Sequence, residues 1–230
     1  MNWLKLSPIY FFISFMLLSV SVFSIVKYGF NLSIEFTGGT VTTPQGFEYV
    51  GPSIGQETIR KTIISIVLAV ATLLIYISFT FKKLKFGVCA IMATLHDSLI
   101  LLGSFSLLGH FFNLQVDLLF VTAVLTTLSF SVHDTIVVFD RIRELSKLTG
   151  TVLVTNEKST INQAITDTIV RSLNNSLTII FMLLALLLMG AESTKPFILA
   201  LLIGTIIGTY SSTFTAAPLL IIWTKLFPKR

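Results

Sequence analysis

Charged residues are scarce in this sequence. Asp, Glu, Lys and Arg make up only 12% of its 230 residues, and 53% are hydrophobic. A soluble domain usually carries about twice that charged fraction. The mean hydropathy is +0.88. The composition excludes an ordinary soluble domain and predicts an all-α polytopic membrane protein.

Cysteine and the common catalytic motifs are also nearly absent. The single cysteine, Cys89, lies in an apolar run, where a small buried hydrophobe is expected. One thiol forms no internal disulfide and no cysteine-based metal cluster. The sequence has no H-E-x-x-H motif, no G-x-S-x-G elbow and no basic run interleaved with aromatics. These absences argue against an enzyme, including an intramembrane hydrolase, and against a metal, another cofactor or nucleic acid as a ligand.

Long hydrophobic segments, by contrast, are abundant. A helix needs about 20 apolar residues to cross a bilayer. Six segments qualify, namely Ile9–Val26, Thr62–Phe81, Phe86–Phe111, Leu118–Phe139, Ile169–Met189 and Phe197–Trp223. The first is interpreted as an uncleaved span, because it exceeds a signal-peptide core and has a poor cleavage site. Residues 1–230 are therefore expected to form one domain of six transmembrane helices in contact with the lipid bilayer.

Lysine and arginine concentrate on one side of these segments. With the N-terminus inside, the outer side holds only Lys27, Arg60, Lys61 and Lys195. The inner side holds Lys5, Lys82, Lys83, Lys85, Arg141, Arg143, Lys147, Lys158, Lys225, Lys229 and Arg230. The positive-inside rule therefore predicts that both termini are cytoplasmic.

Two connections are long enough to have structure of their own. Residues 27–61 are expected to form a short extracytoplasmic segment with the only extended structure of the chain. Residues 140–168 are expected to form a cytoplasmic loop. Its second half places Ile161, Ile165 and Ile169 at i, i+4 and i+8. This spacing predicts an amphipathic helix suited to the membrane interface.

Five ionisable residues lie within the predicted spans: His96, Asp97, His133, Asp134 and Arg171. A charge at the bilayer centre costs roughly 2.5–3.5 kcal/mol on insertion scales, so such residues commonly handle ions or protons. At about 1.5 Å per residue, Asp134 lies about 8 Å from the inner end and Arg171 within about 6 Å of it, whereas Asp97 lies about 16 Å deep. Asp134 and Arg171 can therefore share a layer.

An acid pair beside an arginine suits a proton relay. Burial disfavours the charged form of a carboxylate, whereas a nearby guanidinium favours it. An aspartate between these influences can change protonation when its partner moves, while Arg171 stays charged. We therefore predict a relay of Asp134, Arg171 and Asp97, with Asn174 and Asn175 in the polar shell of Arg171. A static ion pair that joins two helices is the alternative.

The two histidines are candidates for accessory roles. Neighbouring residues on a helix point about 100° apart, so His96 and His133 are expected to turn away from the aspartate that follows each of them. Hydrogen bonding between helices is therefore favoured over proton transfer for both.

The last span carries a packing signal. Gly204 and Gly208, at i and i+4, predict a close helix–helix approach. Pro218 predicts a kink or an end of that helix.

Several motifs resemble the SecF family of membrane subunits of the bacterial Sec protein-export machinery. The stretch from Ser131 to Glu144 resembles the fourth-span signature of that family. The other similar stretches follow in family order, namely Ile34–Thr40 after the first span, Val50–Gly55 before the second, His96–Asp97 in the third, Asn162–Thr178 in the fifth and Gly204–Ser212 in the sixth. Together these motifs cover most of the chain.

The resemblance implies a fold like half of a resistance–nodulation–division transporter, located in the bacterial cytoplasmic (inner) membrane and completed by a SecD-like subunit. It implies use of the proton-motive force to promote late translocation of exported, unfolded proteins at the Sec translocon channel. It also implies roles in proton transport for Asp134 and Arg171, which match the family's positions. Two alternatives stay open: half of a proton-coupled small-molecule exporter of the same superfamily, and a non-coupling structural subunit of the translocase.

The chain departs from the family pattern at two places. The family usually has asparagine before the motif aspartate, where this chain has His133. Members also usually carry a folded outer domain between the first two spans, whereas only Val41–Tyr49 separates the flanking motifs here. The short segment argues against a large outer porter domain and leaves contact with exported protein mainly to the SecD-like subunit.

Overall fold

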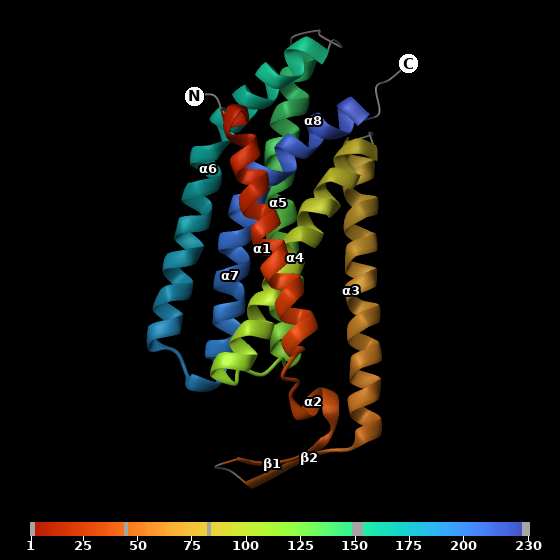
Figure 1. Ribbon diagram of the computed structural model, residues 1–230, viewed down its shortest axis with the longest axis vertical. Helices are drawn as coiled ribbons and strands as arrows, with labels where there is room; N and C mark the ends of the chain where they lie inside the picture. Colours follow the sequence, from red (N-terminus) through yellow and green to blue (C-terminus); the bar gives the residue numbers. More distant parts are fainter. Residues whose placement is uncertain (1–2, 44–45, 82–83, 149–153, 227–230) are drawn as a thin grey trace.

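Six long, apolar helical stretches run side by side (Figure 1). The structure is a computed structural model that describes residues 3–43, 46–81, 84–148 and 154–226. The stretches are α1 (Ser7–Tyr28), α3 (Pro52–Phe81), α4 (Leu84–Phe112), α5 (Leu118–Leu148), α6 (Val154–Met189) and α7 (Lys195–Ser211), which continues into α8 (Ala217–Leu226). All six are long and apolar enough to cross a membrane. The prediction of an all-α protein with six spans is confirmed.

The two ends of the bundle differ. One end carries the short 3-10 helix η1 (Trp3–Leu6) and α8 (Figure 1). The opposite end carries α2 (Ile34–Thr37) and a hairpin of β1 (Gly39–Thr43) and β2 (Gly46–Val50), which pair in antiparallel fashion from Gly39↔Val50 to Thr43↔Gly46. The hairpin projects away from the helices. The 3-10 turn η2 (Glu192–Thr194) joins α6 to α7 at this end.

The two motifs that flank the hairpin pack directly on each other. Gly38 has a φ of 70°, and a Cβ there would lie 2.9 Å from the Cα of Pro52. A Cβ at Gly55 would lie 2.7 Å from the carbonyl oxygen of Phe36. Only glycine fits such close approaches and such a φ. The base of the hairpin is therefore closed by glycine contacts that do not depend on the residues between the motifs.

The segment 140–168 differs from the predicted loop. It is helical up to Leu148 as part of α5 and again from Val154 as part of α6. Charged side chains do not end a helix once it leaves the apolar layer, because they are good helix formers in water. The face with Ile161 and Ile165 is buried within the protein against the core cluster, in place of the predicted contact with the membrane interface.

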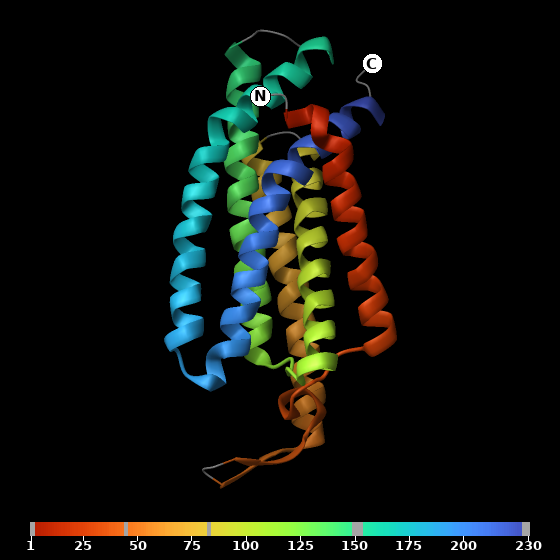
Figure 2. The same cartoon turned by 60° about the vertical axis from the view of Figure 1, so that its left-hand side comes forward.

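The central helices are α4, α5 and the α7–α8 stretch. Their apolar windows are half or more buried, whereas those of α1, α3 and α6 are mostly exposed. Figure 2 shows α1 and α6 at opposite sides, with α4, α5 and α7 between them. Polar groups on the buried sides of α4, α5 and α7 are therefore shielded from lipid by the neighbouring helices.

Small residues bring these helices close together. A Cβ at Gly103 of α4 would overlap the backbone of Ser21 on α1, and a Cβ at Gly204 of α7 would overlap Thr127 of α5. Gly208 lies against Ser131, with a Cβ position 3.2 Å from the Cβ of that serine. The backbones of α7 and α5 therefore approach closely at the level of Ser131, as small-x-x-x-small spacing permits.

A π-helical turn joins α7 to α8. This turn, η3 (Ser212–Ala216), takes up one extra residue per turn, and α8 then leans away from the direction of α7 (Figure 1). Pro218 is the second residue of α8 and follows the π-helical turn almost directly. The bend therefore comes at the π-helical turn just before the proline.

Candidate functional site

Asp97 lies at the centre of the bundle and joins three helices. Its Oδ2 accepts hydrogen bonds from the hydroxyls of Ser131 on α5 and Ser211 on α7, each at 2.5 Å. Its Oδ1 lies 2.9 Å from Nδ1 of His96. Asp97 and His96 are each 7% exposed. The carboxylate therefore joins α4, α5 and α7 in the buried interior of the bundle.

The contact between His96 and Asp97 was not expected from helix geometry. Side-chain torsions let the imidazole of His96 turn back onto the neighbouring carboxylate, although the two Cβ atoms diverge by about 100°. The prediction that His96 turns away from Asp97 is therefore wrong. For His133 the structure does place the side chain on the exposed side of α5.

Asp134 is a second buried carboxylate, one helical turn beyond Ser131 on α5. It is 4% exposed, and its Oδ2 accepts a hydrogen bond of 2.8 Å from the hydroxyl of Ser172 on α6. Ser131 and Asp134 stand at i and i+3, so they share one side of α5. The two carboxylates are therefore connected through a short stretch of a single helix.

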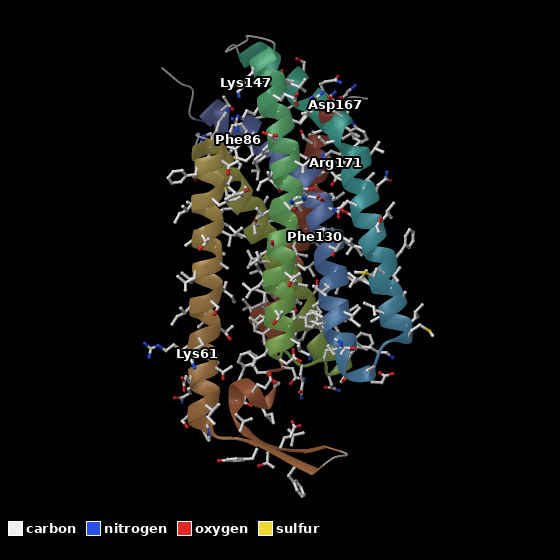
Figure 3. All side chains as sticks on the ribbon, turned by 180° about the vertical axis from the view of Figure 1, so that it is seen from behind. Lys61, Phe86, Phe130, Lys147, Asp167 and Arg171 are labelled. Carbon is white, nitrogen blue, oxygen red and sulfur yellow. The ribbon has the colours of Figure 1, made fainter. Side chains whose placement is uncertain are left out.

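Arg171 precedes Ser172 on α6 but does not pair with Asp134 in this structure. Its side chain is exposed, and no ion pair within 4 Å joins it to Asp134. Figure 3 labels Arg171 on α6, beside α5. The geometry therefore shows Asp134 hydrogen-bonded to the neutral hydroxyl of Ser172, the residue that directly follows Arg171 on α6. A static Asp134–Arg171 clamp is not what holds these two helices in this conformation.

Polar side chains line the outer side of α5 and α6. On α5, Thr122, Thr126, Ser129 and His133 are exposed at i, i+4, i+7 and i+11, which places them along one side of the helix. On the adjoining α6, the exposed polar residues are Arg171, Asn174, Asn175 and Thr178. We call this surface the polar face. Figure 3 looks onto α5, with α3 and α6 on either side of it.

The polar face is unusual for a surface at bilayer depth. The threonines bond back to their own helix, as Thr126 does to the carbonyl of Thr122 and Thr178 to that of Asn174. His133, Arg171 and the two asparagines are larger polar groups, and their exposure to hydrocarbon is costly. Such groups normally face protein or water inside a membrane.

The serines of the site were missed by sequence analysis. Ser131, Ser172 and Ser211 supply all the side-chain hydroxyls bound to the two buried carboxylates. A usable signal existed for two of them, since Ser131 lies one turn before Asp134 and Ser172 follows Arg171 directly. Ser211 lies in the sixth-span stretch Gly204–Ser212, but nothing in that stretch pointed to Asp97, which Ser211 meets through the packing of α7 on α4 and α5.

Comparison with known proteins identifies the family. The family model for the C-terminal region of the protein export membrane proteins SecD and SecF matches residues 35–226. The model of the SecD/SecF GG motif matches residues 23–43, which include the close-packed Gly38. The chain belongs to the SecD/SecF family of protein export membrane proteins.

Individual relatives within that family are SecF subunits. A protein translocase subunit SecF from Thermobaculum terrenum is 48% identical over 182 residues, covering 77% of this chain and 56% of the relative. A SecF from Anaerolinea thermophila is 41% identical, covering 77% of this chain and 58% of the relative. The chain thus spans little more than half the length of the curated relatives it matches.

A solved structure shows the same arrangement of helices. The crystal structure of SecDF from Thermus thermophilus, described as a translocon-associated membrane protein, superposes with a TM-score of 0.87 at 27% identity. The match covers 98% of this chain and 39% of that one. The six-helix unit therefore corresponds to part of a larger SecDF chain, and the protein is a multi-pass membrane protein of a transport family.

Proposed function

We propose that this chain is an auxiliary subunit of the Sec protein-export machinery, which uses the proton-motive force to promote late translocation of unfolded proteins across the bacterial cytoplasmic membrane. The observation that carries the proposal is the buried Asp134 on α5, which is hydrogen-bonded to Ser172 on α6. Ser172 directly follows Arg171, a permanent cation. Buried ionisable groups at bilayer depth are characteristic of proton pathways. No covalent chemistry is assigned to the chain.

The proposed mechanism exchanges the partner of Asp134. The hydroxyl of Ser172, which donates to Asp134 in the structure, can serve a neutral carboxyl without any charged partner. A deprotonated carboxylate suits Arg171, because a desolvated ion pair needs a charged partner. Adjacent residues on a helix differ by about 100°, so a rotation or shift of α6 against α5 brings one or the other to Asp134. Proton uptake and release would thus move one helix against another.

The energy available is sufficient for such a movement. One elementary charge that crosses 100 mV carries about 2.3 kcal/mol. Packed helices with two arrangements differ by a few kcal/mol, so a single proton can bias the equilibrium between them. Asp97 extends the proposed relay toward the middle of the membrane through the shared stretch of α5.

A SecD-like subunit is the proposed partner. The polar face presents Arg171, Asn174, Asn175 and His133 where a lone chain would meet lipid. A second six-helix unit packed there would shield these groups and could bring its own acids to Arg171. The match to a SecDF chain more than twice as long supports this arrangement. The Sec translocon channel and exported unfolded proteins are the further proposed partners.

The proposed orientation places both termini in the cytoplasm. The end with η1 and α8 adjoins most of the lysines and arginines, including Arg141, Arg143 and Lys147 at the end of α5. Cytoplasmic ends carry this excess. The hairpin would then lie on the outer side.

A proton-coupled small-molecule exporter receives less support. Such a protein needs a large outer porter domain or an internal substrate cavity. Between α1 and α3 the described residues form only α2 and a two-stranded hairpin. The relatives reported above are protein translocase subunits.

The deciding experiment is reconstitution of the chain with its SecD-like subunit and the Sec channel in vesicles. A transmembrane proton gradient is expected to accelerate the late phase of translocation, and an ionophore should remove that gain. Equal translocation with and without the gradient would leave a non-coupling structural subunit as the better description. Co-purification with an efflux partner in place of a SecD-like subunit would favour the exporter.

Contact at the polar face can be tested by crosslinking. Cys89 is 1% exposed, so a cysteine introduced on the surface can be labelled selectively with a photoreactive maleimide. Ser129→Cys, on the polar face, is expected to form an adduct with the SecD-like subunit. Ser19→Cys is the matched control, an exposed serine on the outer side of α1. Adducts from both positions, or from neither, would contradict a specific interface at α5 and α6.

A further inference from the structure

The hydrogen bonds of Asp97 restrict where its protons can lie. Three groups converge on the carboxylate: the hydroxyls of Ser131 and Ser211 on Oδ2, and Nδ1 of His96 on Oδ1. An ionised carboxylate only accepts hydrogen bonds, so it satisfies all three groups if Nδ1 carries a proton. The environment therefore suits an ionised Asp97 beside a neutral His96 in its Nδ1–H tautomer.

The same tautomer leaves one free acceptor. Nε2 of His96 is buried and has no hydrogen-bond partner among the described residues. In the Nδ1–H tautomer this nitrogen carries a lone pair that can accept a proton. The opposite tautomer would require a protonated Asp97 that donates to Nδ1.

We infer that His96, rather than Asp97, binds the proton in this part of the relay. The proton adds to the lone pair of Nε2, while the Nδ1–H···Oδ1 hydrogen bond stays in place and no bond is broken. A dyad of net charge −1 becomes a neutral imidazolium–carboxylate pair. Departure of the proton from Nε2 restores the first state. The inference rests on the proposed function, since it assigns a further proton-binding residue to the same relay.

The geometry assigns different roles to Asp97 and to the two serines, Ser131 and Ser211. Asp97 supplies the counter-charge that an imidazolium needs in a dry interior. Ser131 and Ser211 are positioning residues, because their bonds to Oδ2 turn Oδ1 toward His96. A hydrogen bond from Nδ1–H to a carboxylate is a common way to fix the tautomer and the orientation of a histidine.

The neighbouring elements bring few other titratable groups to this layer. On α5 these are the buried Asp134, which is bound to Ser172, and His133, which is exposed. The phenols of Tyr10 on α1, Tyr76 on α3 and Tyr210 on α7 are the remaining ones within the spans. The charged residues of α1, α3 and α7 lie at helix ends, and η3 and the described part of α8 up to Thr224 carry none. The titratable groups of the contacting elements are Tyr10, Lys27, Tyr28, Glu57, Arg60, Lys61, Tyr76, His133, Asp134, Asp140, Arg141, Arg143, Glu144, Lys147, Lys195 and Tyr210.

The sequence makes the inference directly measurable. The chain has 3 histidines, so nitrogen-15 labelling of histidine gives a small set of NMR signals. In the complex with the SecD-like subunit, the signals absent from His96→Asn belong to His96. On acidification through the range of about pH 8 to 5, Nε2 is expected to gain a proton while Nδ1 stays protonated throughout. An Nε2 that never becomes protonated in this range, or an unprotonated Nδ1, would overturn the inference.

Variants of the positioning groups give a second readout. Asp97→Asn removes the counter-charge, so the imidazolium signal is expected to be lost or strongly weakened. Ser211→Ala is expected to keep the imidazolium signal. Identical His96 signals in both variants and the native protein would contradict the roles assigned to Asp97 and Ser211.

Proton flux separates this inference from the proposed function. The side-chain amide of His96→Asn can still donate from near the Nδ1 position to Asp97 but has no counterpart of Nε2. Flux through the reconstituted complex is expected to fall at least tenfold. Full gradient-dependent translocation in His96→Asn would overturn the inference and leave the proposed function standing. Absence of gradient dependence in the native protein would instead contradict the proposed function. If His96→Asn misfolds, the NMR titration of the native complex still decides.

Discussion

Replacement of Asp134 by asparagine is expected to abolish the gain in protein translocation that a proton gradient produces, while the protein stays folded. The amide oxygen of asparagine can accept the hydrogen bond from Ser172 that the carboxylate accepts in the structure. The amide cannot gain or lose a proton, and it cannot form an ion pair with Arg171. Translocation in vesicles, measured with and without the gradient, should therefore show a gradient-dependent part at least tenfold smaller.

Asp140→Asn is the matched control for this variant. Asp140 lies on the same helix and is exposed, so loss of its charge should leave the gradient dependence unchanged. A second comparison tests the structural alternative, because Asp134→Leu with Arg171→Leu removes both groups while keeping side-chain bulk. Gradient-dependent translocation that survives in this double variant would show that the two residues only support the structure.

Replacement of Gly103 by alanine is expected to cause the largest loss of stability among small substitutions. The added Cβ would overlap the Cα and Cβ of Ser21 on α1, so two helix backbones must separate. Backbone atoms cannot move aside as a flexible side chain can, and forced overpacking typically costs about 1–3 kcal/mol or more. Separation also strains the hydrogen bond from Ser24 to Ser106 and that from Ser106 to the carbonyl of Gly29.

Thermal unfolding in detergent, followed by circular dichroism, measures this effect. The midpoint of Gly103→Ala should fall by several degrees. Gly51→Ala provides the control, since a Cβ at Gly51 meets nothing closer than 3.9 Å and its φ is not positive. Equal midpoints for the two variants would show that α1 and α4 have room to separate at little cost.

The order of motifs was enough to predict the family and the number of helices. A sufficiently long apolar segment can be recognised from its own sequence without knowledge of the neighbouring helices, because each segment must span the bilayer by itself. The ends of the helices were harder to predict. The charges after Asp140 marked the end of the apolar layer, yet α5 continues to Leu148. Hydropathy reports where a helix leaves lipid, and it does not report where the helix ends.

For the two aspartates, the sequence indicated their importance but not the residues that they contact. Their presence in apolar segments identified them as the centre of the site, since a buried charge is costly wherever it lies. Their partners could not be derived. The bond of Asp134 to Ser172 in place of Arg171 depends on the rotation of α6 by a single residue. The contact of His96 with Asp97 depends on side-chain torsion angles, which the helical periodicity of the sequence does not predict.

The sequence by itself determined the membrane class, the six spans, the family and the few charges that the apolar segments contain, because each follows from composition and the order of residues along the chain. Only the tertiary structure decided which hydroxyl meets which carboxylate, that Nε2 of His96 is buried without a hydrogen-bond partner among the described residues, and that a polar face lies open along α5 and α6. A hydrogen bond requires two atoms within about 3 Å, whereas helical periodicity fixes a side chain only to within one side of its helix.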